Sequence, residues 1–175
     1  MEQIIIYVNG KDRIGLISDI TKQIRNLNGN VETSKMIKLG QDFNMLMLIS
    51  INSQKIDLLN DNLSLYDDLN ISIKKTLNNS MNLNNKYIFI LKGADTEGIV
   101  HQCTQLFSDL NINIIDLETQ LINAPVTGTP LFYIKAVISI SKDISLQTIR
   151  NQIENLERKA NVKIKFEAFN PELNH

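Results

Sequence analysis

Apolar residues recur along this chain with two different periods, and the two periods predict strands and helices in a regular order. Alternating apolar residues are typical of half-buried strands, whereas apolar residues three or four positions apart indicate an amphipathic helix. In the first half these patterns predict strand, helix, strand, strand, helix and strand at residues 3–9, 16–27, 30–39, 43–51, 53–66 and 69–75. We expect one solvated face on strand 30–39, and a hairpin turn at Gly40–Asp42.

The second half repeats this order of elements. The predicted segments are 87–91, 99–110, 113–122, 131–140, 146–160 and 162–168, with a strand, helix, strand, strand, helix and strand in turn. An overlay at an offset of 83 residues matches Gly10 with Gly93, Asp12 with Asp95, Gly15 with Gly98, Thr21 with Thr104, and Asn30 with Asn113. The chain is therefore an internal duplication. Each βαββαβ copy predicts an α+β fold, a four-stranded antiparallel sheet with two helices on one face.

Residues 77–86, which are rich in Asn, follow neither period and suit a linker between domains. We predict a first domain at 1–78, a linker at 79–85, a second domain at 86–170 and a frayed tail at 171–175.

Bulk composition narrows the function classes. The 175 residues are 43% hydrophobic and 21% charged, which is typical of globular proteins. A formal net charge of −1 gives no electrostatic attraction to nucleic acid or anionic membranes. The sequence has no apolar run of roughly 20 residues and no signal-peptide pattern, so we expect a cytoplasmic protein.

The repeated turn Asn9–Leu16 carries the clearest candidate chemistry. It lies between a predicted strand and a predicted helix, and we expect Asp12 to cap that helix. Gly10 and Gly15 are expected to leave the backbone uncovered, so that N–H groups at the helix start face solvent. Such groups bind carboxylates or phosphates. The pattern returns at Lys92–Ile99.

A second feature is the asparagine that starts the third element of each half, Asn30 and Asn113. Its amide both donates and accepts hydrogen bonds. We expect the asparagine to come together with the turn, a combination that suits a zwitterion. The alternative is that Asp12 and Asp95 are ordinary caps and that the asparagines only end turns.

Catalysis has little support in the sequence. His101 and His175 lie in a helix and in the tail, with no shared constellation, and Cys103 falls on an apolar helix stripe where core packing is expected. With one cysteine there is no disulfide within the chain and no cysteine metal cluster. No phosphate-loop, zinc-protease or nucleophile-elbow motif is present. We predict no catalytic residue, no metal and no cofactor.

The sequences of the two turns resemble the signature of a known domain family. The sequences G-K-D-R-I-G-L-I with Asn30, and G-A-D-T-E-G-I-V with Asn113, resemble the D-R-P-G-L/I signature of ACT domains, which are small ferredoxin-like modules that bind amino acids. Three further segments, Lys38–Ser50, Asn111–Thr119 and Gly128–Phe132, resemble the glycine cleavage system transcriptional repressor family.

The resemblance implies a regulatory protein that binds a small amino acid such as glycine and acts on a transcriptional activator by protein contact, without binding DNA itself. It also implies a set of ligand contacts in both copies of the turn. These are Gly10, Asp12, Arg13, Ile14, Gly15, Leu16, Asn30, Asp95, Glu97, Gly98, Ile99 and Asn113.

The two copies depart from the signature unequally. Ile14 and Glu97 stand where the signature has proline, and Thr96 stands where it has arginine. Because the second turn is more acidic, we predict that the first turn, with Arg13, is the better site and that the second is degenerate. A ligand-free pair of domains that serves only to bind a partner is the alternative, and exposed edge strands could drive a homodimer.

Overall fold

The computed structural model describes residues 1–76, 85–94, 97–124 and 128–170. The chain divides into two compact units, Met1–Asn79 and Ser80–His175. Except for Asn85, the predicted linker at 79–85 lies outside the described residues, and so does the predicted tail at 171–175. The finer domain boundaries therefore stay a prediction.

The first unit has the predicted order of elements. Its elements are β1 (Glu2–Lys11), α1 (Leu16–Asn26), β2 (Asn30–Leu39), β3 (Asp42–Ile51), the 3-10 turn η1 (Ser53–Lys55), α2 (Ile56–Leu63) and β4 (Leu69–Lys75). The segment predicted as one helix at 53–66 is thus a 3-10 turn followed by a shorter helix. The Asn52 side chain caps the 3-10 turn by accepting a hydrogen bond from the Gln54 N–H at 3.0 Å.

The second unit repeats the same order. Its elements are β5 (Lys86–Ala94), α3 (Ile99–Asp109), β6 (Asn113–Asn123), β7 (Pro130–Ser139), α4 (Leu146–Ala160) and β8 (Val162–Ala168). The predicted α+β fold class, two βαββαβ units in tandem, is confirmed.

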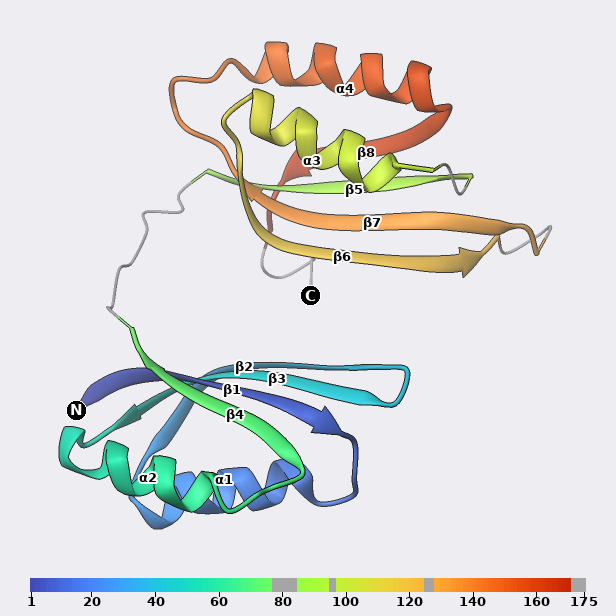
Figure 1. The fold of residues 1–175 in the computed structure, drawn as a ribbon. Helices are drawn as coiled ribbons and strands as arrows, with labels where there is room; N and C mark the ends of the chain where they lie inside the picture. The colour runs from blue at the N-terminus through green and yellow to red at the C-terminus, as the bar shows by residue number, and fades with distance from the viewer. Residues whose placement is uncertain (77–84, 95–96, 125–127, 171–175) are drawn as a thin grey trace. The chain divides into compact units, whose positions relative to one another are not determined.

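Each unit is a four-stranded antiparallel sheet with two helices on one face (Figure 1). The strand orders are β2-β3-β1-β4 and β6-β7-β5-β8, so the central strand pairs are β3 with β1 and β7 with β5. Both edge strands β2 and β6 shift register just after they begin, between Val31 and Thr33 and between Ile114 and Asp116. The duplication therefore includes this irregularity.

The core of each unit lies between the sheet and its helices. On β3 the predicted apolar stripe is buried, with Met45, Met47 and Ile49 at most 3% exposed. Helix α1 contributes Leu16, Ile20 and Ile24, at most 2% exposed. The second core contains an edge-to-face pair of Phe89 and Phe107, with ring centroids 5.0 Å apart. This packing holds each first helix against its sheet.

Edge strand β2 differs from its prediction. The alternation of apolar and polar residues predicted one solvated face, but all ten residues of β2 are exposed. Its apolar side chains include Ile37 at 52% and Leu39 at 63% exposure. The sequence pattern cannot show that β2 lies at the outer edge of the sheet.

Candidate functional site

The turn between β1 and α1 is shorter than the sequence predicted. Strand β1 continues through Lys11, so Gly10 is a paired strand residue opposite Phe43 and Leu69. A Cβ on Gly10 would lie 2.6 Å from Leu69 Cδ2 and 2.9 Å from the Asp68 carbonyl oxygen. Gly10 is therefore required by close packing of β4, and not by an uncovered backbone as expected.

Gly15, and not Asp12, is the N-cap residue of α1. Its backbone is left-handed, with φ 88°, and no side chain caps the helix. A Cβ at Gly15 would have nothing within 4 Å. The expectation that Asp12 caps the helix is therefore wrong, because the left-handed turn at Gly15 separates Asp12 from the helix start.

Asp12 instead ties the turn to the β2–β3 hairpin. Its Oδ2 lies 2.8 Å from Nζ of Lys38 on β2. Its backbone N–H donates to the Gln41 carbonyl at 3.3 Å. Both side chains of the ion pair remain partly exposed, so we give it a positioning role rather than a large contribution to stability.

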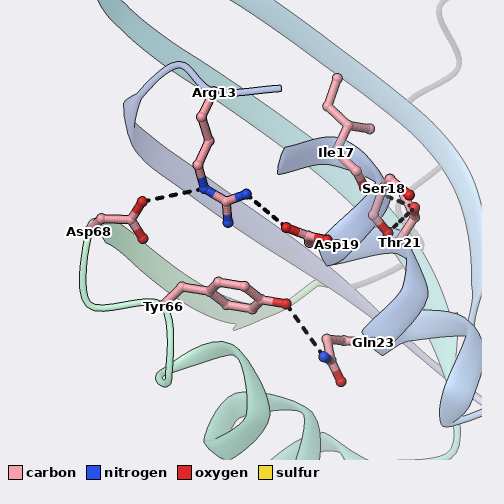
Figure 2. Close-up of polar contacts among 8 residues, drawn as sticks. All are labelled: Arg13, Ile17, Ser18, Asp19, Thr21, Gln23, Tyr66 and Asp68. Carbon is pink, nitrogen blue, oxygen red and sulfur yellow. Dashed lines mark hydrogen bonds and ion pairs between the residues drawn. The ribbon is translucent and has the colours of Figure 1, made fainter. Parts of the chain in front are cut away.

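Arg13 ties the same turn to the opposite side of the unit, as Figure 2 shows. Its Nη1 lies 2.8 Å from Oδ2 of Asp19 on α1, and its Nε lies 3.4 Å from Oδ2 of Asp68, just before β4. The guanidinium carbon is 6.0 Å from the centre of the Tyr66 ring. The hydrogen bond that Arg13 donates to Asp19 has the largest effect and raises the pKa of Arg13. Burial, the next largest effect, lowers this pKa, and the charges of Asp19 and Asp68 raise it again, so that the net shift is upward.

A further hydrogen bond connects α1 to the residues around Arg13. Nε2 of Gln23 donates to the Tyr66 hydroxyl at 3.4 Å (Figure 2). Because two carboxylates already face Arg13, its positive charge is balanced within the unit. The argument that Arg13 offers a free charge to a ligand carboxylate therefore loses its basis, although Arg13 still fixes the shape of the turn.

The turn does present backbone donors. The N–H groups of Ile17 and Ser18 lie in the first turn of α1, where a helix provides no carbonyl partner, and no side chain caps them. The Leu16 N–H donates to the Arg13 carbonyl at 3.3 Å. Ile14 is fully exposed. This uncapped end, with its positive dipole, can accept a carboxylate, worth about 0.3–1 kcal/mol.

The structure does not bring Asn30 to the turn within one unit, which corrects our expectation. Asn30 pairs with Ser50, whereas Gly10 pairs with Phe43, seven residues earlier on β3. At about 3.4 Å per strand residue, the two positions lie roughly 24 Å apart along the sheet. Asn113 is likewise opposite Ser139, at the far end of its sheet from Gly98. The cause is the topology, because α1 returns the chain to the end of the sheet where β1 began.

Two other predicted contacts are core residues. The side chains of Leu16 and Ile99 are each 2% exposed and pack beneath the sheet, so only their backbones are available to a ligand.

The second turn also ends in a left-handed glycine, but its side chains differ. Gly98 is left-handed with φ 76°, and no side chain caps α3. Asp95 and Thr96 lie outside the described residues. Glu97 is exposed, and Gln102 occupies the position that corresponds to Asp19. The carboxylate that holds Arg13 in the first unit is thus absent from the corresponding helix position of the second.

The residues that hold the first turn were not predicted as site residues. They are Asp19, Lys38, Tyr66 and Asp68. No local signal marks them, since Lys38 is 26 residues from Asp12 and Asp68 is in a different loop. The one usable hint is that the turn and the start of β4 must meet at one end of the sheet if the βαββαβ order is correct.

The described residues give little to support catalysis. Cys103 is 1% exposed, and burial raises the pKa of its thiol to about 12, as expected for a packing residue. Within 1–76, 85–94, 97–124 and 128–170, no group of His, Cys, Asp or Glu residues is placed to hold a metal ion. In the same part of the chain, no helix has the length and apolar character needed to cross a membrane.

The first unit matches the model of a known domain family. The profile of the ACT domain family matches residues 2–74. The glycine cleavage system transcriptional repressors of Escherichia coli (strain K12) and Shigella flexneri are each 28% identical over 121 residues. The alignments cover 67% of this chain and 64% of each relative. The resemblance noted in the sequence is confirmed.

Solved structures extend the likeness to both units. The crystal structure of an unknown protein from Galdieria sulphuraria has a TM-score of 0.85 and 28% identity, and covers 97% of this chain and 99% of its own. A structure provisionally assigned as a glycine cleavage system transcriptional repressor has a TM-score of 0.69, with 96% and 97% coverage. Its sequence identity is 20%, so it supports the fold alone.

Proposed function

We propose that this chain, whose N-terminal unit belongs to the ACT domain family and whose second unit repeats that fold, is a non-catalytic regulatory protein that senses a small amino acid such as glycine. The observation that carries the proposal is the turn at residues 12–15, which ends in an uncapped helix start and is held from both sides by ion pairs. The similarity to glycine cleavage system transcriptional repressors supports a regulatory role.

The ligand carboxylate would meet the uncapped N–H groups of Ile17 and Ser18 at the start of α1. Gly15 would let it approach closely, because no side chain covers the backbone there. Arg13 would act as a positioning residue, since Asp19 and Asp68 already balance its charge. The second turn would be the weaker site, with Glu97 disfavouring a carboxylate.

The regulatory output would be a contact with a transcriptional activator in the cytoplasm. The relatives are named transcriptional repressors. The net charge of −1 gives no electrostatic support for direct binding to DNA, so a protein partner is the better mechanism.

Thermal unfolding of the full chain with each free amino acid tests ligand binding. An amino acid present at about 100 times its Kd would stabilise the protein by about 2.7 kcal/mol. Acetate and methylammonium, offered together, are the matched control for glycine because they carry its two charges on separate molecules. Glycine should stabilise and the pair should not. Co-precipitation with the activator, with and without the amino acid found, then tests the output.

A second candidate function is a ligand-free pair of ACT domains that only binds a partner. Two ion pairs favour this function, Asp12 with Lys38 and Arg13 with Asp19, because they are enough to hold the turn in place. If no amino acid shifts the unfolding temperature, this second function stands in place of the first.

Edge strand β2 supports a homodimer in either case. It ends the order of its sheet, all ten of its residues are exposed, and its outer backbone groups can pair with another strand. Sedimentation equilibrium of the full chain would give the assembly state.

A further inference from the structure

Two lysines lie directly opposite each other on neighbouring strands of the second unit. Lys92 on β5 is paired in register with Lys163 on β8, so both side chains leave the same face of the sheet. Like charges directly opposite on antiparallel strands repel and destabilise the pair. Both lysines line a pocket of about 450 Å³ at this end of the sheet.

The pocket carries more positive than negative charge. Arg158 also lines it, and Glu157 is its carboxylate. Three cations and one carboxylate leave a net charge of +2. One oxygen of Glu157 is committed, because Oε1 accepts from the Ile164 N–H at 2.7 Å. Across the described residues, no ion pair links Lys92, Arg158 or Lys163 to a carboxylate.

Arg158 has donors to spare. Its Nη2 donates to Asn155 Oδ1 at 2.6 Å and its Nε donates to the Glu154 carbonyl at 3.4 Å. These bonds use two of its five N–H groups and hold the guanidinium in place at the last turn of α4. The remaining donors are available to an anion in the pocket.

The first unit shows what the same sheet positions look like without charge. Lys92, Lys163 and Tyr133 correspond to Asn9, Asn70 and Asn44 by strand register. There, Asn9 donates to Asn44 Oδ1 at 2.7 Å, and Asn70 donates to Asn9 Oδ1 at 3.4 Å. The neutral asparagine ladder satisfies itself.

In the second unit the ladder is replaced by an opposed pair of cations, with Nζ of Lys92 5.5 Å from the centre of the Tyr133 ring. Like charges directly opposite each other on paired strands repel, and a bound anion would reduce this repulsion.

We propose that this pocket binds a small phosphate-bearing anion between Lys92, Lys163 and Arg158. A phosphate dianion matches the net charge of +2, lysine serves as a point charge, and arginine forms a fork that fits phosphate oxygens. A zwitterionic amino acid carries no net charge and does not match. The site is therefore separate from the proposed amino-acid site of the first unit and does not depend on it.

Calorimetric titration of the full chain with inorganic phosphate and with methyl phosphate tests the proposal. At about pH 8 both are mainly dianions, since the second pKa of a phosphate monoester is about 6 and that of inorganic phosphate also lies below this pH. Ionic strength is held constant with chloride. The wild type should show saturable binding of one phosphate. Lys163→Asn, which restores the residue found in the first unit, should weaken it by about tenfold or more, and Lys92→Asn should do the same.

Lys165→Asn is the matched control. It makes the same charge change two residues along β8 on the same face, and Lys165 is already paired with Glu167 at 2.7 Å outside the pocket. Its phosphate affinity should match that of the wild type. Without phosphate, Lys163→Asn should unfold at a temperature equal to or above that of the wild type, because it removes a repulsion.

Two outcomes would overturn the proposal. One is the absence of saturable binding by the wild type. The other is an equal loss of affinity in Lys163→Asn and Lys165→Asn, which would indicate general attraction to a positive surface. Saturable binding of methyl phosphate at least as tight as that of inorganic phosphate would assign the site to a phosphate monoester, whereas binding of inorganic phosphate alone would assign it to the free anion.

Discussion

Asp19 holds Arg13 across the start of α1, with 2.8 Å between the carboxylate Oδ2 and the guanidinium Nη1. Asp68 approaches the same guanidinium from the start of β4 at 3.4 Å. The candidate turn is thus fixed by two elements that follow it in the chain. Asp12, the residue before Arg13, pairs instead with Lys38 on β2. Two neighbouring residues of the turn are therefore held by different elements of the unit.

We expect Asp68→Asn to loosen this turn. Arg13 would keep Asp19 and lose its link to β4, so backbone amides at residues 12–15 should exchange with solvent faster, with little change in global stability. Hydrogen exchange measured by mass spectrometry or NMR would show it. Glu2→Gln is the control, since it breaks an ion pair with Lys75 of 2.9 Å at the far end of the sheet. Equal exchange in both variants would mean that Arg13 does not position the turn.

Gly15 and Gly98 form a matched pair for testing the ligand site. Both cap a helix in the left-handed region, and a Cβ at either has nothing within 4 Å. Valine at either position should cost a similar amount of stability, at least about 1–2 kcal/mol from backbone strain. Amino-acid binding, measured by isothermal titration, should be lost only in Gly15→Val. Unchanged binding in Gly15→Val would refute the first turn as the site, and loss in Gly98→Val would refute the inequality.

Gly10 and Gly93 should not tolerate substitution, for a different reason. A Cβ at Gly10 would lie 2.6 Å from Leu69 Cδ2, and at Gly93 2.4 Å from Val162 Cγ1, where real contacts do not occur. Alanine at either position should cost about 1–3 kcal/mol from overpacking. Urea denaturation would measure the cost. Gly40→Ala is the control. A Cβ at this position would have nothing within 4 Å, so the only cost to an alanine would be its φ of 63°. If all three variants lose the same stability, close strand packing is not the reason for Gly10 and Gly93.

Cys103 should be inert while the protein is folded. Its pKa is raised by burial from 9.0 to about 12, so at about pH 8 its thiolate is scarce and inaccessible. Iodoacetamide should label it only after unfolding.

The same shift sets a pH dependence. The folded state binds the thiol proton more tightly than the unfolded state, so the stabilisation is complete below about pH 9 and is lost as pH rises toward 12. Denaturation of the wild type and of Cys103→Ala between these values would show it. A variant that loses stability as steeply as the wild type would rule out Cys103 as the cause.

Much of the fold follows from the sequence because each element carries a local signal. The alternation in 69–75 and the helical spacing of Ile20 and Ile24 depend only on neighbours along the chain. The local structure also repeats between the two units. Thr21 and Thr104 each donate to a carbonyl four residues earlier, and Asn28 and Asn111 both have positive φ.

Only the tertiary structure shows which residues contact the turn. Sequence spacing suggested Asp12 as a helix cap and Asn30 as a neighbour of the turn, but strand register places Asn30 at the other end of the sheet. It also brings Lys38 and Asp68 to the turn from elements that the local pattern cannot connect. Local periodicity fixes which segments are strands and helices, whereas the partners of a charged side chain depend on pairing between segments far apart in the chain.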